Sequence, residues 1–296
     1  MRRKINGLWN SNCLVLSFFM FACIVEFGNC VAAESHYFTT SDGVRLHYIA
    51  EGAGETLLFV PGWLMPAEIW RRQIEYFSRK YRVIAFDPRS QGDSQVAPSG
   101  NNIQRRAEDL NELIEHLQSR RVVLIGWSLG VLEALLYIKT HGDDKVAALV
   151  FVDNSVGEEP PPKGGSTIRD RGPWDREREV ADFVRAMFKS PQSPRYLTWL
   201  TGEAMRTPLE ASLSLLSIPY PRTFWRSVIY ETRKPLLYAV TASLKRQADN
   251  LRRKRKGTSI EVFAGAGHAL FVDDHERFNS ILDAFLATTL KESSAE

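Results

Sequence analysis

Residues 126–130 read Gly-Trp-Ser-Leu-Gly, a G-x-S-x-G pattern with Ser128 at its centre. Residues 121–125 before it are mostly β-branched and apolar, which predicts a buried strand. Residues 131–138 after it form an apolar run that favours a helix. A strand, a sharp turn and a helix with a serine at the apex make a nucleophile elbow. The alternative is a chance turn with a spare serine, and partners found further along the chain favour the elbow.

The glycines two positions before and after Ser128 let the strand and the helix approach each other closely around a strained turn. The Ser128 hydroxyl then stands free as the candidate nucleophile. The backbone N–H of Leu129, at the start of the helix, can face a negative oxygen that develops beside the serine.

The first 33 residues have the pattern of a secretory signal peptide. A basic start at residues 1–4 precedes an apolar core at residues 14–25, which is too short to span a bilayer comfortably. Small residues at 31–33 then predict cleavage before Glu34. We therefore expect an exported protein, periplasmic or extracellular, whose mature part is residues 34–296. Retention of the segment as an uncleaved anchor stays open.

All three cysteines, at positions 13, 23 and 30, lie within the predicted signal peptide. A mature chain of about 260 residues without cysteine is held by its core alone and is long enough for one sizeable α/β domain. Residues 1–33 carry three positive charges and one negative, so their removal would lower the formal net charge from +3 to +1, and this near neutrality argues against a dedicated nucleic-acid binder. The expected partner is a small-molecule substrate, with no stable membrane span after cleavage and an undetermined oligomeric state.

Strand-like runs alternate with helical ones after an opening hairpin signal at residues 41–43. This order predicts a mostly parallel, eight-stranded sheet with helices on both faces and catalytic groups at the carboxyl ends of the strands. A segment at about residues 154–234 interrupts it with short helical pieces and predicts a helical lid. The eight runs are residues 36–40, 44–50, 56–60, 81–86, 121–125, 146–153, 235–240 and 259–263.

With these pieces in place, residues 34–296 resemble the α/β-hydrolase superfamily, and within it the lid-bearing group of small esterases, lactonases, cofactor-free haloperoxidases and C–C bond hydrolases. The matching pieces are the hairpin, the 61–63 loop (Pro-Gly-Trp), residues 87–94, the elbow, the lid insertion and Gly265-Ala266-Gly267-His268. Two positions depart from the family pattern: Pro61 stands where many members have His, and Ser90 where Gly is common.

The resemblance implies roles for particular residues and requires no metal and no cofactor. Ser128 would be the nucleophile and His268 its general base. The backbone N–H groups of Trp63 and Leu129 would form the oxyanion hole.

The acid of the predicted triad is harder to assign. Many members carry it just beyond the strand that corresponds to residues 235–240, but Leu244 falls at the expected position here. Asp153, at the end of the preceding strand, can reach the same face of the imidazole and is the preferred candidate. Asp249, within a probable helix, is the alternative, and a site with no carboxylate is the third possibility.

Two other clusters have ordinary explanations. Asp273, Asp274 and His275 resemble a metal site only superficially, because acids at the start of the last helix favour its dipole. The basic run at residues 252–256 is typical of a solvated helix end, although an anionic lipid or polymer contact is the alternative reading.

The sequence therefore predicts an exported serine hydrolase, carboxylesterase-like (EC 3.1), that cleaves a small, fairly apolar ester through an acyl-enzyme. Two alternatives remain. The absence of an acid at the position usual in the family is also compatible with a catalytically inactive binding module. The same triad could instead serve lactone, peroxyacid or C–C bond chemistry.

Overall fold

The computed structural model describes residues 34–162 and 175–293. The predicted signal peptide, residues 1–33, lies outside the described residues and stays a prediction. The same holds for residues 163–174, part of the segment predicted as a lid.

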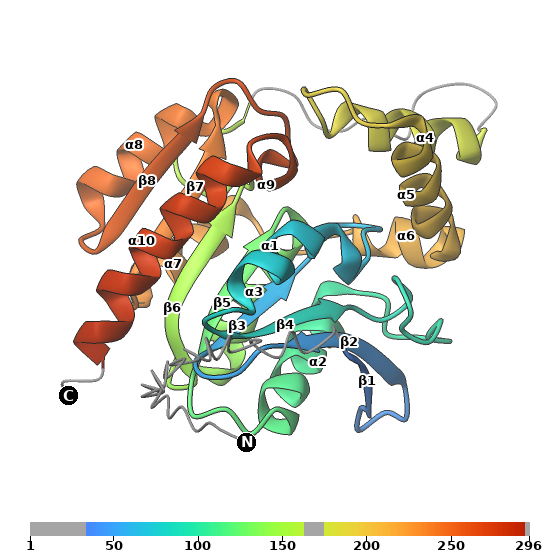
Figure 1. Cartoon of the computed structure of the whole chain (residues 1–296), viewed down its shortest axis with the longest axis horizontal. Helices are drawn as coiled ribbons and strands as arrows, with labels where there is room; N and C mark the ends of the chain where they lie inside the picture. Colours follow the sequence, from blue (N-terminus) through green and yellow to red (C-terminus); the bar gives the residue numbers. More distant parts are fainter. Residues whose placement is uncertain (1–33, 163–174, 294–296) are drawn as a thin grey trace, which may run out of the picture. The chain divides into compact units, whose positions relative to one another are not determined.

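The described residues form one eight-stranded sheet in the order β1-β2-β4-β3-β5-β6-β7-β8 (Figure 1). The first two strands form an antiparallel hairpin, and β2 also pairs antiparallel with β4. All other neighbouring pairs are parallel. The prediction of a mostly parallel eight-stranded sheet is confirmed. The strands are β1 (Glu34–Thr39), β2 (Arg45–Glu51), β3 (Thr56–Val60), β4 (Arg82–Asp87), β5 (Val122–Trp127), β6 (Val146–Val152), β7 (Leu236–Thr241) and β8 (Thr258–Phe263).

Helices cover both faces of this sheet. One hydrophobic cluster joins a sheet face to α2 (Ile103–His116), α3 (Leu129–His141) and α8 (Lys245–Lys254). The other joins the opposite face to the short η1 (Ala67–Trp70), α1 (Arg71–Phe77), α9 (Leu270–Asp273) and α10 (His275–Ser293). A further short helix, η2 (Ala242–Leu244), follows β7. No helix in the described part of the chain is long and apolar enough to cross a membrane.

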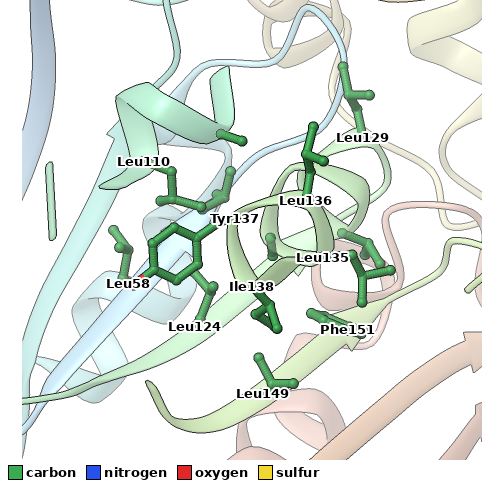
Figure 2. Packing of buried hydrophobic residues seen from close by; sticks show 14 of the residues in the cluster. Leu58, Leu110, Leu124, Leu129, Leu135, Leu136, Tyr137, Ile138, Leu149 and Phe151 are labelled. Atoms are coloured by element: carbon green, nitrogen blue, oxygen red, sulfur yellow. The ribbon is translucent and has the colours of Figure 1, made fainter. Parts of the chain in front are cut away.

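The central strands are apolar on both faces because both faces are covered. In β3, Leu58 faces the cluster that contains Leu110 and Tyr137, whereas Leu57 faces the opposite cluster. Figure 2 shows Tyr137 of α3 beside Leu58 and Leu124, with Leu110 of α2 above them. Full burial of one such side chain contributes about 1.5–3 kcal/mol.

Between β6 and β7, the described residues form four helices: α4 (Arg176–Ala186), α5 (Pro194–Arg206), α6 (Leu209–Leu215) and α7 (Arg222–Glu231). The side chain of Asp175 caps the start of α4, and Ser193 caps α5 with Pro194 as its first residue. The fourth helix packs into the same cluster as α3 through Trp225, Val228 and Ile229, whereas α6 adds Leu215 to that cluster and α4 and α5 belong to the opposite one. The fourth helix therefore belongs to the layer that covers the sheet.

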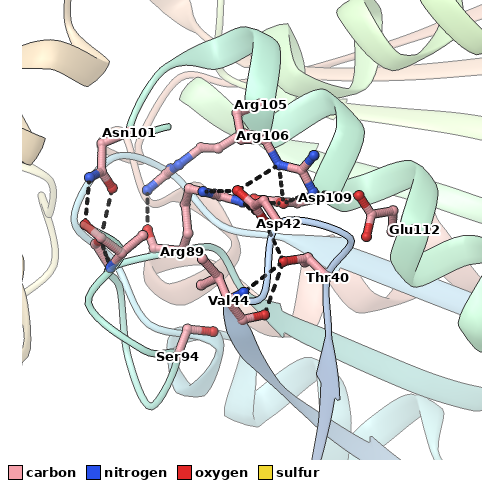
Figure 3. Close-up of polar contacts among 12 residues, drawn as sticks. Thr40, Asp42, Val44, Arg89, Ser94, Asn101, Arg105, Arg106, Asp109 and Glu112 are labelled. Atoms are coloured by element: carbon pink, nitrogen blue, oxygen red, sulfur yellow. Dashed lines mark hydrogen bonds and ion pairs between the residues drawn. The ribbon is translucent and has the colours of Figure 1, made fainter. Parts of the chain in front are cut away.

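A buried arginine ties the β1–β2 turn to α2 (Figure 3). The Arg89 side chain is fully buried, and its Nε donates to Asp109 at 2.5 Å while its Nη1 donates to Asp42 at 3.0 Å. Burial alone would raise the pKa of Asp42. Hydrogen bonds from Arg89 and Thr40 and the charge of Arg89 outweigh it and lower this pKa to about 2.

Replacement of Arg89 by Met should lower the free energy of unfolding by about 3 kcal/mol, because the buried Asp109 loses its main partner. Urea denaturation at pH 7 measures this loss. The pH dependence should change too. A depressed Asp pKa stabilises the fold above about pH 4, and this contribution is lost as the pH falls towards 2. The variant should lose less stability than the wild type over that range.

Arg178→Met is the control, because the Arg178 side chain is 77% exposed. It should stay within about 0.5 kcal/mol of the wild type. Equal stability of the two variants would show that the Arg89 pairs contribute nothing.

Candidate active site

Ser128 occupies the turn between β5 and α3 with φ 53° and ψ −121°. A positive φ is uncommon for a residue with a side chain and costs about 1 kcal/mol or more. The turn is held on two sides: Ser128 N–H donates to the carbonyl of Val152 at 3.0 Å, and the Asn154 amide donates to the Ser128 carbonyl at 2.6 Å. Ser128 is therefore fixed in this conformation by the end of β6 and the loop that follows it.

The two glycines of the elbow are explained by close backbone contacts. A Cβ on Gly126 would lie 2.5 Å from the carbonyl oxygen of Gly130. A Cβ on Gly130 would lie 2.5 Å from the carbonyl oxygen of Val60, at the end of β3. Because real Cβ atoms do not approach so closely, only glycine allows the helix to start this near to both strands.

The structure brings Ser128, His268 and Asp153 together in a row. Ser128 Oγ and His268 Nε2 are 2.8 Å apart, and His268 Nδ1 lies 2.8 Å from Asp153 Oδ2. The Asp153 side chain is 7% exposed, whereas that of His268 is 31% exposed. The imidazole thus has a buried carboxylate on one side and a more accessible hydroxyl on the other.

Asp153 is held from a second strand. Its Oδ1 accepts hydrogen bonds from the backbone N–H and the hydroxyl of Thr241, at 2.7 and 2.8 Å. Since Thr241 ends β7 and Asp153 follows β6, the parallel pairing of these strands places donor and acceptor side by side. Sequence reasoning missed Thr241, although a threonine at the end of the strand next to a catalytic candidate was a usable signal.

Asp249 is not brought to His268. It lies on α8, where its carboxylate accepts a hydrogen bond from Lys245 at 2.5 Å and lies 3.6 Å from Arg252. The hydrogen bond from Lys245 lowers the pKa of Asp249. Leu244, at the position expected for the acid, is buried in the hydrophobic core.

The loop that carries His268 is bound to the connection between α4 and α5. Ala269 N–H donates to the carbonyl of Met187 at 2.9 Å, and Gly267 N–H donates to Asp273 at 2.7 Å. The same Asp273 carboxylate accepts the N–H of Lys189 at 2.8 Å. The expectation that Asp273 merely opens the last helix was wrong: it ends α9 and joins two loops.

The 61–63 loop lies against the elbow. A Cβ on Gly62 would lie 2.9 Å from Ser128 Cβ, so the backbone of this loop passes directly beside the serine. The N–H groups of Trp63 and Leu129 have no acceptor among the described residues. The indole of Trp63 donates to the carbonyl of Ser212 in α6 at 2.8 Å, and its ring packs on Phe183 of α4.

Hydroxyl, imidazole and carboxylate in this order can transfer a proton away from the serine as it attacks a carbonyl carbon. Free backbone N–H groups beside the serine can stabilise the resulting oxyanion. No group of three or more His, Cys, Asp or Glu side chains that could hold a metal ion occurs in the described ranges.

A family model described as alpha/beta hydrolase fold matches residues 55–272. The chain belongs to the alpha/beta hydrolase fold family. Within this family it is 34% identical over 167 residues to a non-heme haloperoxidase from Rhodococcus erythropolis, a match covering 56% of this chain and 58% of that protein. The chain thus spans little more than half the length of that relative.

Two longer matches extend over nearly the whole fold. The AB hydrolase superfamily protein YisY from Bacillus subtilis is 25% identical over 275 residues, which cover 84% of this chain and 98% of that protein. The crystal structure of a proposed aryl esterase from Burkholderia cenocepacia has 25% identity and a TM-score of 0.76, and covers 87% of this chain and 100% of that chain. The resemblance inferred from the sequence motifs is therefore confirmed at the level of the family.

The close contact at Gly130 generates a prediction. Gly130→Ala should lower the free energy of unfolding by about 1–3 kcal/mol, because the new methyl group overlaps the carbonyl oxygen of Val60 and the backbone must shift. Chemical denaturation measures this change.

Gly202→Ala is a matched control, since a Cβ at this position of α5 has no atom within 4 Å. Inside a helix, alanine should stabilise by up to about 1 kcal/mol. A Gly130→Ala protein as stable as Gly202→Ala would contradict the steric explanation of the elbow.

Proposed function

We propose that this protein is a serine hydrolase that cleaves small, fairly apolar esters through an acyl-enzyme. The observation that carries the proposal is the row of two 2.8 Å contacts from Ser128 through His268 to Asp153. In this proposal Asp153 is the acid of the triad. The proposed aryl esterase from Burkholderia cenocepacia, with the same fold, supports it.

In the first half-reaction, Ser128 Oγ attacks the carbonyl carbon of the ester while His268 Nε2 takes the hydroxyl proton. Asp153 holds the N–H on Nδ1 and stabilises the imidazolium that forms. The Trp63 and Leu129 N–H groups bind the oxyanion. When the tetrahedral intermediate collapses, the C–O bond to the alcohol breaks and the leaving oxygen takes the proton from Nε2.

In the second half-reaction, water attacks the acyl group on Ser128. His268 Nε2 accepts a proton from the water and returns it to Ser128 Oγ as the acid product leaves. The backbone N–H groups act again on the second oxyanion, so one site serves both steps.

The aromatic side chains around the loop that passes beside Ser128 support a small, apolar substrate in this proposal. The Trp63 and Phe183 rings pack with centroids 5.1 Å apart, next to the loop that contacts Ser128. A ligand site of mostly apolar side chains with a few polar groups favours a substrate of the same character. The insertion that carries Phe183 is bound to the catalytic loops, which limits the room for a bulky substrate.

A second candidate activity is peroxyacid formation, favoured by the match to a non-heme haloperoxidase. Here hydrogen peroxide replaces water in the attack on the acyl group, and the product is a peracid. Assay of ester hydrolysis and of peracid release from the same preparation, with and without hydrogen peroxide, separates the two activities.

The nucleophile is tested by Ser128→Ala. Hydrolysis of p-nitrophenyl acetate should fall about 10⁶-fold in kcat, to near the background rate, because no other group forms the acyl intermediate. A fluorophosphonate probe should label the wild type at Ser128 and not the variant. Ser227→Ala, on α7, should keep full activity and labelling. An unlabelled, inactive wild type would support a binding module instead.

The acid is tested by a pair of substitutions. Asp153→Asn should lower kcat about 10⁴-fold with a small change in KM, because the carboxylate acts on the tautomer and charge of His268. Asp249→Asn should stay within about 0.5 kcal/mol of wild-type stability and keep its activity. The reverse pattern would assign the acid to Asp249, and two active variants would remove the carboxylate from the mechanism.

A further inference from the structure

The oxyanion loop, residues 62–65, has a conformation that needs support from outside. Leu64 has φ 65°, an uncommon value for a branched side chain. Pro61, which precedes the loop, has no polar side chain to hold it. The support comes instead from the amide of Gln91, in the loop after β4.

Gln91 makes three hydrogen bonds to the backbone of this loop. Its Nε2 donates to the carbonyl oxygens of Gly62 at 3.1 Å and Met65 at 2.8 Å. Its Oε1 accepts the N–H of Leu64 at 3.1 Å. The Gln91 side chain is fully buried, so no water competes for these positions.

The bond to Gly62 bears directly on the proposed oxyanion hole. The carbonyl of Gly62 and the N–H of Trp63 belong to one planar trans peptide and point in opposite directions. A donor that holds the Gly62 oxygen therefore also sets the direction of the Trp63 N–H. The N–H of Met65 reaches the same oxygen at 3.2 Å, so Gln91 shares this task with a turn inside the loop.

The orientation of the Gln91 amide is itself set by a buried ion pair. Arg106 Nη2 donates to Gln91 Oε1 at 2.7 Å, and Arg106 Nη1 donates to Glu133 at 3.0 Å. Because a guanidinium only donates, the amide oxygen must face Arg106 and the NH₂ group must face the loop carbonyls. Both charged side chains are 1% exposed. Burial raises the pKa of Glu133, and the charge of Arg106 opposes this shift.

Glu133 lies on α3, the helix that begins directly after Ser128. The contacts thus run without interruption from the helix of the nucleophile, through Arg106 of α2 and Gln91, to the loop that carries the Trp63 N–H. One end of this path is the helix that begins directly after Ser128, and the other is the loop that passes beside Ser128.

We propose that Gln91 is a positioning residue for the oxyanion hole: held by Arg106 and Glu133, it fixes the peptide whose Trp63 N–H binds the oxyanion. This inference rests on the proposed serine hydrolase function. It concerns the transition state, since the oxyanion exists there and not in the bound ester.

The test compares Gln91→Ala and Gln91→Glu with the wild type on p-nitrophenyl acetate and its thiono analogue, in which sulfur replaces the carbonyl oxygen. Gln91→Ala should lower kcat on the ordinary ester roughly 10- to 100-fold and change KM less than about threefold, because a misplaced donor costs rate. Sulfur accepts hydrogen bonds poorly, so the loss should be smaller on the thiono ester. The preference for the oxygen ester should therefore shrink.

Gln91→Glu keeps the size of the side chain, accepts from Leu64 and pairs with Arg106, but cannot donate to the Gly62 and Met65 carbonyls when ionised. It should melt no lower than Gln91→Ala and still lose at least as much kcat. This variant separates the positioning role from stability, and it serves as the test if Gln91→Ala does not fold.

Gln247→Ala is the matched control, because Gln247 is a buried glutamine whose amide donates to the carbonyl of Pro160 at 2.8 Å. It should keep the wild-type ratio of the two esters. Gln91 variants with kcat within twofold of the wild type, or with equal losses on both esters, would overturn the positioning role. The proposed function fails separately, if the wild type hydrolyses no ester or Ser128→Ala keeps the activity.

Discussion

The contact of Gly130 with the carbonyl oxygen of Val60 is the constraint on which the site depends. It lets α3 begin where β3 ends, so that Ser128 stands at the junction of two parallel strands. The strained serine backbone is then held by Val152, the last residue of β6, and by Asn154 in the loop that follows. Removal of this close approach would separate Ser128, the proposed nucleophile, from the loop beside it. The parallel order of the sheet brings the remaining groups to the same edge.

Much of the fold and the main candidates could be predicted from local patterns. The strand before Ser128 and the helix after it have distinct hydrophobic patterns, and both occur where expected. Asp153 was preferred over Asp249 because it directly follows a strand, and the structure places it beside His268. Chain position at a strand end was sufficient, because strand ends in a parallel sheet converge whatever the intervening sequence.

The supporting contacts could not be predicted in this way. Gln91 lies 29 residues from Gly62 in the sequence. Gly267, which follows β8, contacts the backbone of Met187, which precedes β7. Such contacts depend on how loops from different strands pack. Neither the hydrophobic periodicity of the sequence nor the spacing of its motifs predicts them. Asp273 shows the same difficulty, since an acid before a helix normally indicates a favourable dipole contact. Here its carboxylate binds the backbone of Lys189 instead.

The helical insertion between β6 and β7 is joined to three loops of the sheet domain. Ser212 accepts from the Trp63 indole, Met187 accepts from Ala269, and Thr207 donates to the carbonyl of Ser90. These hydrogen bonds connect the insertion to the loops that flank the proposed nucleophile and general base. A substitution that changes the shape of the insertion would therefore also displace the loops that flank Ser128 and His268, because these hydrogen bonds join them. Engineering or natural divergence of this chain therefore has to change the insertion and its anchoring loops together.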